Sequence, residues 1–539
     1  ANTTGTQNTI VGKSAGAANT TGGYNVAMGT DTFSSNTEGA NNTAIGWQTM
    51  AGNTTGGENV AVGKGALDGG TTCEGNVAIG TDAMGGAVAG QGYNTAVGYN
   101  AMLVSTSASG TTAIGNQSLD ALTTGDYNTA VGAAALGANS TTNNNTAVGY
   151  AALAANVAAD NTAVGSLSLY TNNSGISNTA VGNSSLRLNT TASYNTAVGA
   201  GALYTNSTGA QNTAVGQGAL NVSTASNNTA VGNNAGAATT SGANNVAIGA
   251  ESLRGVCTGS HNVAIGTDTL KNITSGGENI AIGRDAMNDI TDGTQNVAIG
   301  HESLTKMTSS GETVAVGFQA LEVATSVGNT GVGSKAGELI SGSGQFNTCI
   351  GYHAGDSITT GYRNTMLGQS TDVSAAGGAY QIAIGEDLIA YGQSTITVGS
   401  GASSNRVWNA FTSNASWTRI SDERYKKDIQ NNTDLGLAFI NDLRPVTFKF
   451  KLMSEIDSSL PDYDETDSLG VPIPQDRMYG LIAQEVKEVL DDHNITDFGG
   501  HTTTENEVEL QGISQEMFIH PLIKAVQELS AKVEALENN

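Results

Sequence analysis

The chain has 539 residues and a formal net charge of −26, with 72 glycines and 5% aromatic residues. This acidic balance argues against a nucleic-acid partner, because phosphate binding needs clustered Lys and Arg. Glycine does not recur at every third position, which excludes a collagen helix. No apolar run reaches the ~18 residues that a membrane-spanning helix needs, so we expect no membrane insertion.

A five-residue motif, Asn-Thr-Ala-Val-Gly or a close variant, recurs through residues 1–400. Most neighbouring copies are 17 residues apart and a few are 16 or 18 apart. Copies begin, among others, at Asn25, Asn42, Asn59, Asn76, Asn94, Asn128, Asn178, Asn195, Asn245, Asn296 and Asn364. A short period held over this length is typical of stacked repeats. The chain starts at Ala1 already in repeat register and without Met, so we expect a processed product or a fragment.

Each repeat contains a predicted strand, a corner and a polar turn. Positions two and four of the motif are β-branched or aliphatic and share one face, while position three, usually Ala, lies on the other. The motif Gly suits a corner, a small residue followed by Leu forms a second short segment, and an Asn/Thr/Ser/Gly run closes the coil. The repeats therefore predict a mainly β fold, a β-solenoid of about 17 residues per coil that buries Val and Leu between coils. Two dozen coils would give a rod on the order of 115 Å. The first Asn of each motif should stack on its neighbours as an amide ladder.

The alanine of each motif suggests an assembly. A strand face open to water should carry polar residues, and Ala recurs there instead. We expect this face to pack against other chains, most simply in a homotrimer. The alternative is that Ala only keeps the wall of the coil smooth.

The sequence contains no recognisable metal or cofactor site. Cys73, Cys257 and Cys349 are far apart, and the six His residues lack ligand spacing. We expect no cofactor, no metal and no disulfide framework. Cys349 occupies an Ala position, where symmetry could bring copies together, but a buried small residue is the simpler interpretation.

The composition changes after residue 400. Residues 401–420 contain Trp408, Phe411 and Trp417 and are predicted to cap the solenoid, whose last coil would otherwise expose its core and strand edge. Residues 421–539 should form a small α+β domain, with a strand ending near Phe450, a helix ending near Leu490 and an intervening loop at 457–476. Residues 519–537 should form a coiled-coil helix with apolar residues at 3-4-3-4-3 spacing and Pro521 in its first turn.

Several motifs in the last 119 residues occur in a specific order. They are Ser-Asp-x-Arg-x-Lys followed by Asp-Ile from Ser421, Leu-Arg-Pro-Val from Leu443, Gly-Leu-Ile-Ala-Gln-Glu-Val from Gly480, and the terminal helix. This series resembles the self-cleaving intramolecular chaperone domain found at the C-terminus of phage endosialidases, tail fibres and tail spikes. The repeat region resembles, less specifically, the β-roll heads of trimeric autotransporter adhesins.

The chaperone resemblance implies a trimeric domain that directs folding of the preceding fibre and then cuts itself off. By position, it implies that Ser421 is the nucleophile, that Lys426 is its base, and that Asp422 and Arg424 support the site. The cleaved bond would join Ile420 and Ser421. A lysine can activate a serine hydroxyl when burial favours its neutral form. Without the resemblance, Ser421-Asp422 would be interpreted as a helix or turn cap and Lys426-Lys427 as a solvated face.

Together, these features predict an extracellular structural component of a viral tail fibre or spike. Its partners would be two further copies, other tail proteins and an unidentified host surface receptor. Any enzymatic activity would be a single self-cleavage. The main alternative is a bacterial trimeric surface adhesin, which should carry a membrane anchor where this sequence has a polar coiled coil. A polysaccharide-cleaving enzyme would need paired carboxylates, which the repeats lack. An ice-binding face is suggested by the Thr column, but the alternation of Thr with Val favours a buried position.

Overall fold

The structure, a computed structural model, describes residues 2–86, 90, 92–401, 406–410, 418–419, 426, 429–449, 451, 454–458, 477–503 and 511–538. The chain divides into two compact units, Ala1–Ile420 and Ser421–Asn539. Each unit is described by itself.

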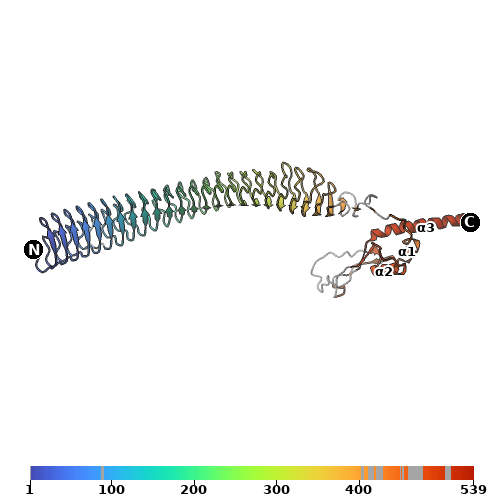
Figure 1. The fold of residues 1–539 in the computed structure, drawn as a ribbon, viewed down its shortest axis with the longest axis horizontal. Coiled ribbons are helices and arrows are strands. Elements are labelled where there is room, and N and C mark those ends of the chain that lie inside the picture. Colours follow the sequence, from blue (N-terminus) through green and yellow to red (C-terminus); the bar gives the residue numbers. More distant parts are fainter. Residues whose placement is uncertain are drawn as a thin grey trace. The chain divides into compact units, whose positions relative to one another are not determined.

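The first unit is a β-solenoid in which each coil contributes one short strand (Figure 1). Strands β1 to β24 pair in parallel, each with the next along the chain, and most have three residues. Their bounds are Thr9–Val11, Val26–Met28, Thr43–Ile45, Val60–Val62, Val77–Ile79, Thr95–Val97, Thr112–Ile114, Thr129–Val131, Thr146–Val148, Thr162–Val164, Thr179–Val181, Thr196–Val198, Thr213–Val215, Thr229–Val231, Val246–Ile248, Val263–Ile265, Ile280–Ile282, Val297–Ile299, Val314–Val316, Thr330–Val332, Thr348–Ile350, Thr365–Leu367, Ile382–Glu386 and Thr395–Ser400. The predicted solenoid of about 17 residues per coil is confirmed.

The glycine that ends each motif turns the chain sharply at the end of the strand. Gly46 has a φ of +139°, a conformation that residues with a side chain rarely adopt. A Cβ atom on Gly46 would lie 2.6 Å from the carbonyl oxygen of Gly63 in the next coil. The corner therefore requires Gly both for its backbone angles and for the close approach of stacked coils.

The alanine of each motif points into the coil, not outward. Ala113, Ala180 and Ala264 are fully buried, while their strand neighbours are partly exposed. The predicted outward Ala face is therefore wrong. The physical reason is space: at Gly331, which occupies an Ala position, a Cβ would already lie 2.8 Å from Cγ of Leu321. The interior beneath the strand is so thin that in most coils it holds nothing larger than a methyl group.

Opposite the alanines, the core is a column of leucines and methionines such as Leu119, Leu136 and Leu153, all fully buried. The sequence correctly assigned these residues to the core. It wrongly assigned the Val of position four to the same core, because the alternation along a strand does not say which side faces inward.

The predicted asparagine ladder is confirmed. The side-chain amide of Asn42 donates to Oδ1 of Asn25 at 3.2 Å, and that of Asn59 donates to Oδ1 of Asn42 at 3.0 Å. Both residues also donate their backbone N–H to the preceding Oδ1. A second buried ladder, which the sequence left among the turn residues, joins Asn36 to Asn19 at 2.8 Å and Asn53 to Asn36 at 2.9 Å. These contacts satisfy most of the amides buried inside the rod.

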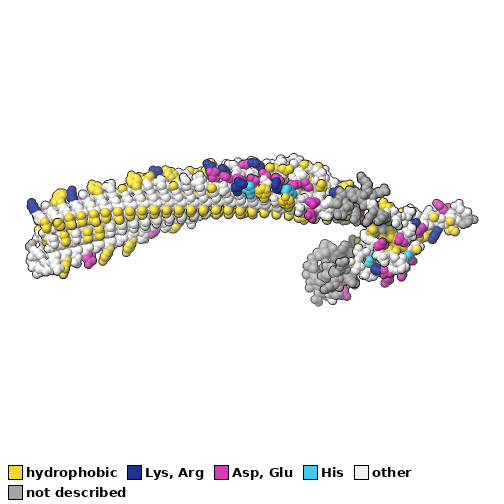
Figure 2. Space-filling view, viewed as in Figure 1, with side chains coloured by type: hydrophobic (Ala, Val, Ile, Leu, Met, Phe, Trp, Pro, Cys, Tyr) yellow, Lys and Arg dark blue, Asp and Glu magenta, His cyan; other side chains and the backbone are white. Residues whose placement is uncertain are grey.

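The outer face of the solenoid sheet carries no charged residue at the outward positions of β1 to β22. Position two is Thr, Val or Ile and position four is Val, Ile, Met or Leu in every one of these strands. Position four therefore forms a continuous aliphatic row, and position two forms a mixed row of Thr, Val and Ile. Figure 2 shows apolar side chains in rows along the rod. Val215, Ile248 and Leu367 are 36%, 38% and 41% exposed. We call these two rows the outer sheet face.

The position of the Thr column differs from the expectation. These threonines are half-buried on the outer sheet face, so the prediction that they occupy a buried site is wrong. The row formed by motif position four is aliphatic throughout. The outer sheet face therefore differs from a surface of aligned hydroxyl groups.

The parallel stacking stops after β24. Strand β25, Arg406–Ala410, pairs antiparallel with β24, and β26, Thr418–Arg419, pairs antiparallel with β25. The ring of Trp408 stacks on Tyr391 with centroids 3.8 Å apart and planes within 6°. These residues lie where the sequence predicts a cap. Phe411 and Trp417 fall outside the described residues.

The second unit is a small α+β domain. Its described elements are α1 (Leu437–Asp442), β27 (Val446–Phe448), β28 (Met478–Gly480), α2 (Ala483–Asp492), β29 (His501–Thr503), β30 (Gln511–Ile513), a 3₁₀ turn (Gln515–Phe518) and α3 (Ile519–Glu537). Strand β27 pairs antiparallel with β28, and β29 with β30. Helix α3 has the bounds expected of the terminal helix. Most of the predicted loop, residues 459–476, lies outside the described residues.

The asparagine ladder makes a testable prediction. In Asn178→Ala, the backbone N–H of Asn195 loses the side-chain oxygen that it now meets at 3.0 Å. The carbonyl of Ala192 loses one of its two amide donors and keeps that of Asn189 at 3.0 Å. A buried unpaired group costs about 1–3 kcal/mol, so amides of the coils around Asn178 should exchange with deuterium at least several-fold faster. Asn183→Ala, on the exposed corner of the same coil, is the control. Equal exchange rates in both variants would contradict a stabilising ladder.

Candidate functional site

Most of the predicted catalytic group lies outside the described residues. This applies to Ile420, Ser421, Asp422 and Arg424. Lys426 is described and is exposed. The boundary between the two units falls between residues 420 and 421, at the bond that the resemblance implies is cut. The Ser421–Lys426 dyad remains a prediction.

The described part of the C-terminal unit has its own small core. Phe439 of α1 packs with Val486 and Leu490 of α2 and with Ile495, all buried. The rings of Phe498 and Phe518 lie 6.0 and 6.3 Å from the ring of Phe439. An aromatic cluster thus joins both helices to the segment that leads into α3.

An exposed ion pair links two of the motifs on which the chaperone resemblance rests. Arg444, from Leu-Arg-Pro-Val, bonds both carboxylate oxygens of Glu485, from Ala-Gln-Glu-Val, and the Nε–Oε2 distance is 2.9 Å. The hydrogen bonds from Arg444 lower the pKa of Glu485 below its ordinary value. This pair could not be predicted from the sequence, because 41 residues separate its members.

Helix α3 is fixed to α1 through a carboxylate. Oε2 of Glu528 accepts a hydrogen bond from the backbone N–H of Leu437 at 2.8 Å, at the N-terminus of α1. A negative charge there is favourable, because the first N–H groups of a helix lack partners within the helix. Pro521 and Ala525 are buried on the same side of α3.

The other side of α3 is apolar and exposed. Its exposed fractions are 52% for Leu522, 57% for Val526, 50% for Leu529, 45% for Val533 and 76% for Leu536. These residues recur at 4-3-4-3 spacing, which is the pattern of a coiled-coil seam. We call them the α3 seam. Like the outer sheet face, the α3 seam is an extended and exposed apolar surface.

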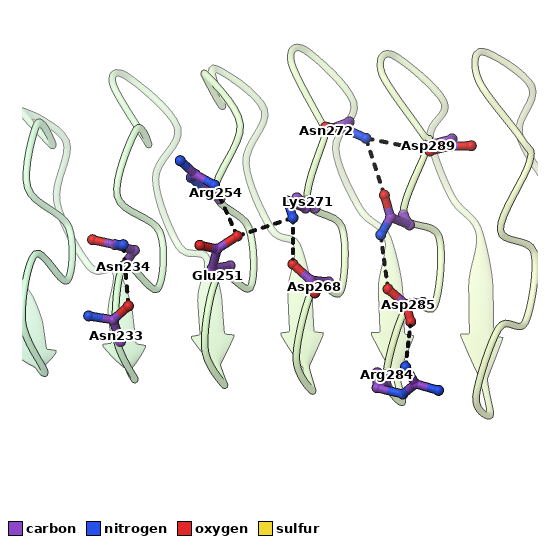
Figure 3. Close-up of polar contacts among 11 residues, drawn as sticks. Asn233, Asn234, Glu251, Arg254, Asp268, Lys271, Asn272, Arg284, Asp285 and Asp289 are labelled. Atoms are coloured by element: carbon purple, nitrogen blue, oxygen red, sulfur yellow. Dashed lines mark hydrogen bonds and ion pairs between the residues drawn. The ribbon is translucent and has the colours of Figure 1, made fainter.

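A polar network runs along successive coils of the solenoid (Figure 3). Lys271 lies 2.7 Å from Asp268 and 3.1 Å from Glu251 of the preceding coil, and Arg254 lies 2.9 Å from Glu251. The hydrogen bond from Lys271 lowers the pKa of Glu251. These pairs are exposed to solvent, so each contributes little to stability.

Three potential metal ligands meet on the same edge of the rod. Ligand atoms of Asp285, His301 and Glu302 lie within 4.8 Å of one another, the one such cluster found among the described residues. The guanidinium of Arg284 contacts Nε2 of His301 and lies 3.4 Å from Asp285. The positive charge of Arg284 beside these ligand atoms disfavours the binding of a metal ion. The sequence did not reveal this cluster, because Asp285 lies one coil before the adjacent residues His301 and Glu302.

All three cysteines are buried and none of them forms a disulfide bond. Cys349 points into its own coil, so its thiol cannot reach another copy through the outer sheet face. Burial raises the pKa of Cys257 to about 11, and burial also raises the pKa of Cys349 above its ordinary value. Their thiols are therefore held protonated and unreactive.

Comparison with known proteins gives one result. Residues 421–495 match the family model described as chaperone of endosialidase, Peptidase_S74. The match begins at the predicted nucleophile and supports an intramolecular chaperone at the C-terminus. It covers the Ser421, Leu443 and Gly480 motifs and stops before α3. No curated protein matches the chain.

The contact between α3 and α1 makes a second prediction. Glu528→Ala removes the carboxylate that accepts from Leu437, and a hydrogen bond to a charged group contributes about 1.5–3 kcal/mol. Amides of α1 should exchange with deuterium about tenfold faster in the full-length variant. Glu534→Ala, exposed on the same helix, should leave α1 unchanged. An α1 equally protected in both variants would contradict the proposed anchoring of α3.

Proposed function

We propose that this protein is the shaft of a viral tail fibre or spike, built as a homotrimer. Its C-terminal unit aligns the three chains and then releases itself by cleavage before Ser421. The shaft would hold host-binding surface away from the particle and would attach to other tail proteins. The single observation that carries this proposal is the chaperone match at 421–495 directly after a repetitive solenoid.

The outer sheet face supports a trimer more strongly than the alanine face that the sequence analysis expected to lie between chains. A monomeric rod would expose two aliphatic or Thr/Val rows along more than twenty strands. Exposed apolar patches of that extent mark interaction surfaces. Because all copies carry the same rows at the same spacing, a second and third copy of this chain match the face along its whole length.

The same regularity creates a problem of alignment. A shift of one coil places Val on Val and Thr on Thr again, so slipped pairings have nearly the same energy. The α3 seam contains few heptads and can set one register before the long faces associate. A C-terminal chaperone therefore has a physical task in this protein.

The unit boundary supports release at Ser421. A cut between residues 420 and 421 would separate the two compact units and would leave each one whole. Lys426 is exposed in the single chain, so burial of its amine would come from contacts between copies. Cleavage would then occur after trimerisation. Unfolding of the separated rod would then be irreversible, because the unfolded chains lack the unit that aligns them. The lifetime of the rod would depend on the height of its unfolding barrier.

Cleavage is tested directly by mass spectrometry. Full-length protein, folded after expression, should yield a C-terminal fragment that starts at Ser421. Ser421→Ala should remain intact, because it lacks the nucleophilic hydroxyl, and Ser454→Ala should cleave normally. Intact chains in the wild type, or cleavage of Ser421→Ala at the same bond, would contradict the assignment.

Trimerisation through the outer sheet face is tested by placing charges on it. The triple variant Val181→Lys, Val198→Lys and Val215→Lys puts ammonium groups on the face in three adjacent coils. We expect loss of the trimer in sedimentation, because each buried unpaired charge costs several kcal/mol.

The matched control places the same charges on the exposed corner of the same coils, with Asn183→Lys, Ala200→Lys and Gln217→Lys. This variant should remain trimeric. Trimers in both triple variants, or a monomeric wild type, would contradict the proposed interface.

The alternative function is a bacterial trimeric surface adhesin. None of the helices within the described residues combines the length and apolar character needed to cross a membrane. The chaperone match favours the viral proposal, since adhesin-like repeats have no independent support among the comparisons.

A further inference from the structure

Two columns of residues flank the outer sheet face in the coils of β1 to β22. The residue immediately before each ladder Asn forms the leading column, and the residue immediately after each motif Gly forms the trailing column. In the coil of β4 these residues are Glu58 and Lys64, which lie beyond opposite ends of the strand and are exposed. A contact between copies through the outer sheet face would therefore have these columns as its rim.

The symmetry of the proposed trimer decides which column meets which. The strands stack in parallel along the rod, so in a trimer they run around the three-fold axis in the same sense in every copy. The end of a strand in one copy then approaches the beginning of the strand at the same height in the next copy, as in any heterologous closed ring. The trailing column of each copy therefore faces the leading column of its neighbour.

The charges of the two columns are complementary across this contact. In the coils of β4 and β17 an acidic leading residue accompanies a basic trailing one, Glu58 with Lys64 and Glu278 with Arg284. All four side chains are exposed. The two members of each pair are six residues apart along a nearly extended segment, roughly 15–20 Å, so they cannot reach each other within one chain. Glu278 accepts a hydrogen bond from the neutral amide of Gln295 at 3.0 Å, which leaves its charge uncompensated.

The basic residues have neighbours in their own chain that leave them accessible to a second copy. The amine of Lys64 lies 5.2 Å from the ring centroid of Trp47 in the preceding coil, and an aromatic ring carries no net charge. The guanidinium of Arg284 contacts His301 and lies 3.4 Å from Asp285, yet its side chain is 60% exposed (Figure 3). Both cations are thus held along the trailing column and remain open to solvent.

The complementarity depends on the register between copies. Without slip, Lys64 faces Glu58 and Arg284 faces Glu278, and no leading and trailing residues of like charge meet in the coils of β1 to β22. A shift of one coil in either direction removes both acidic partners. It places Lys64 opposite Asn41 or Gly75, and Arg284 opposite His261 or Gln295. The rows of the outer sheet face repeat at every coil, whereas both charge pairs form at one alignment.

We propose that Lys64 and Arg284 of each copy form ion pairs with Glu58 and Glu278 of the next copy and so favour the in-register trimer. This inference rests on the proposed function, since it needs the trimer. Each pair lies on a solvated rim and contributes little to affinity. Complementary charges at a rim instead speed productive encounters and fix the alignment of the partners. The α3 seam sets the register at one end of the protein, and these pairs favour the same register along the shaft.

Zero-length coupling with a carbodiimide tests the pairing in the full-length protein. The reagent joins an amine to a carboxylate that touches it, so mass spectrometry of the digested trimer should find Lys64 joined to Glu58. Arg284→Lys keeps the positive charge and supplies an amine, which should become joined to Glu278. Coupled chains should migrate together in a denaturing gel, because the two members of a pair are too far apart to react within one chain.

The matched control moves the amine by one coil. The double variant Lys64→Thr and Thr81→Lys has an unchanged composition, but its amine faces Gly75, so no link to Glu58 should form. A link to Glu58 in this variant would show that the coils slip and would overturn the inference. A link from Lys64 of the wild type to Glu74, beside Gly75, in place of Glu58 would overturn it as well.

The rate of assembly tests what the pairs do. Refolding is followed by light scattering in a Ser421→Ala background, which is expected to keep the chain whole. Glu58→Gln with Glu278→Gln should form trimers at least threefold more slowly than the parent at low salt, because the rim loses its complementary charge. At about 1 M salt, where the Debye length is about 3 Å, the difference should disappear.

A second pair of acidic residues in the leading column provides the control for charge alone. Asp160→Gln with Glu312→Gln removes the same charge from the same column, opposite Ser166 and Phe318. This variant should assemble at the rate of the parent. Equal slowing in both double variants, or no slowing in either, would contradict the role given to the ion pairs.

The failure of this inference differs from failure of the proposed function. A wild type that is trimeric and cleaves itself, but in which Lys64 is not joined to Glu58, would refute the pairing and leave the proposed function standing. A monomeric, uncleaved wild type would refute the proposed function and the pairing together.

Discussion

The thinness of each coil determines most other properties of this protein. Beneath the strand most coils hold only the methyl group of an alanine, and at Gly331 even a Cβ would lie 2.8 Å from Cγ of Leu321. The motif therefore places Ala inside and its larger aliphatic residues outside. A rod built this way has an interior filled by Ala, Leu and paired asparagines, and an exterior that is apolar along one whole side. This cross-section is the physical basis of the proposed trimer.

The regular exterior explains why a rod of this kind would be followed by an alignment domain. Stacking within a chain is unambiguous, because covalent connections put each strand beside the next. Association between chains has no such guide, since equivalent rows repeat at every coil. Helix α3 combines a short apolar seam with a fixed attachment to α1 through Glu528 and Leu437. It is suited to bringing chains together at one defined position.

The sequence predicted the features that depend on local period. The solenoid, the corner glycines, the first asparagine ladder and the bounds of α3 follow from spacing and residue type alone. The sequence did not predict which side of the strand faces inward. Alternation is the same for both sides, and whether Ala or Val lies inside depends on the width of the coil. The Asn19–Asn36–Asn53 ladder and the Arg444–Glu485 pair also required coordinates, since each joins residues whose relation appears only after folding.

The central claim is that the outer sheet face lies between copies of the chain. It is tested most directly by the reactivity of a thiol introduced by Val198→Cys, because Cys73, Cys257 and Cys349 are buried and should not react. The account predicts that this thiol is protected from maleimide in the folded protein and links copies covalently on oxidation. The thiol introduced by Ala200→Cys, on the exposed corner, should be labelled at once. Equally rapid labelling at both positions would contradict the account.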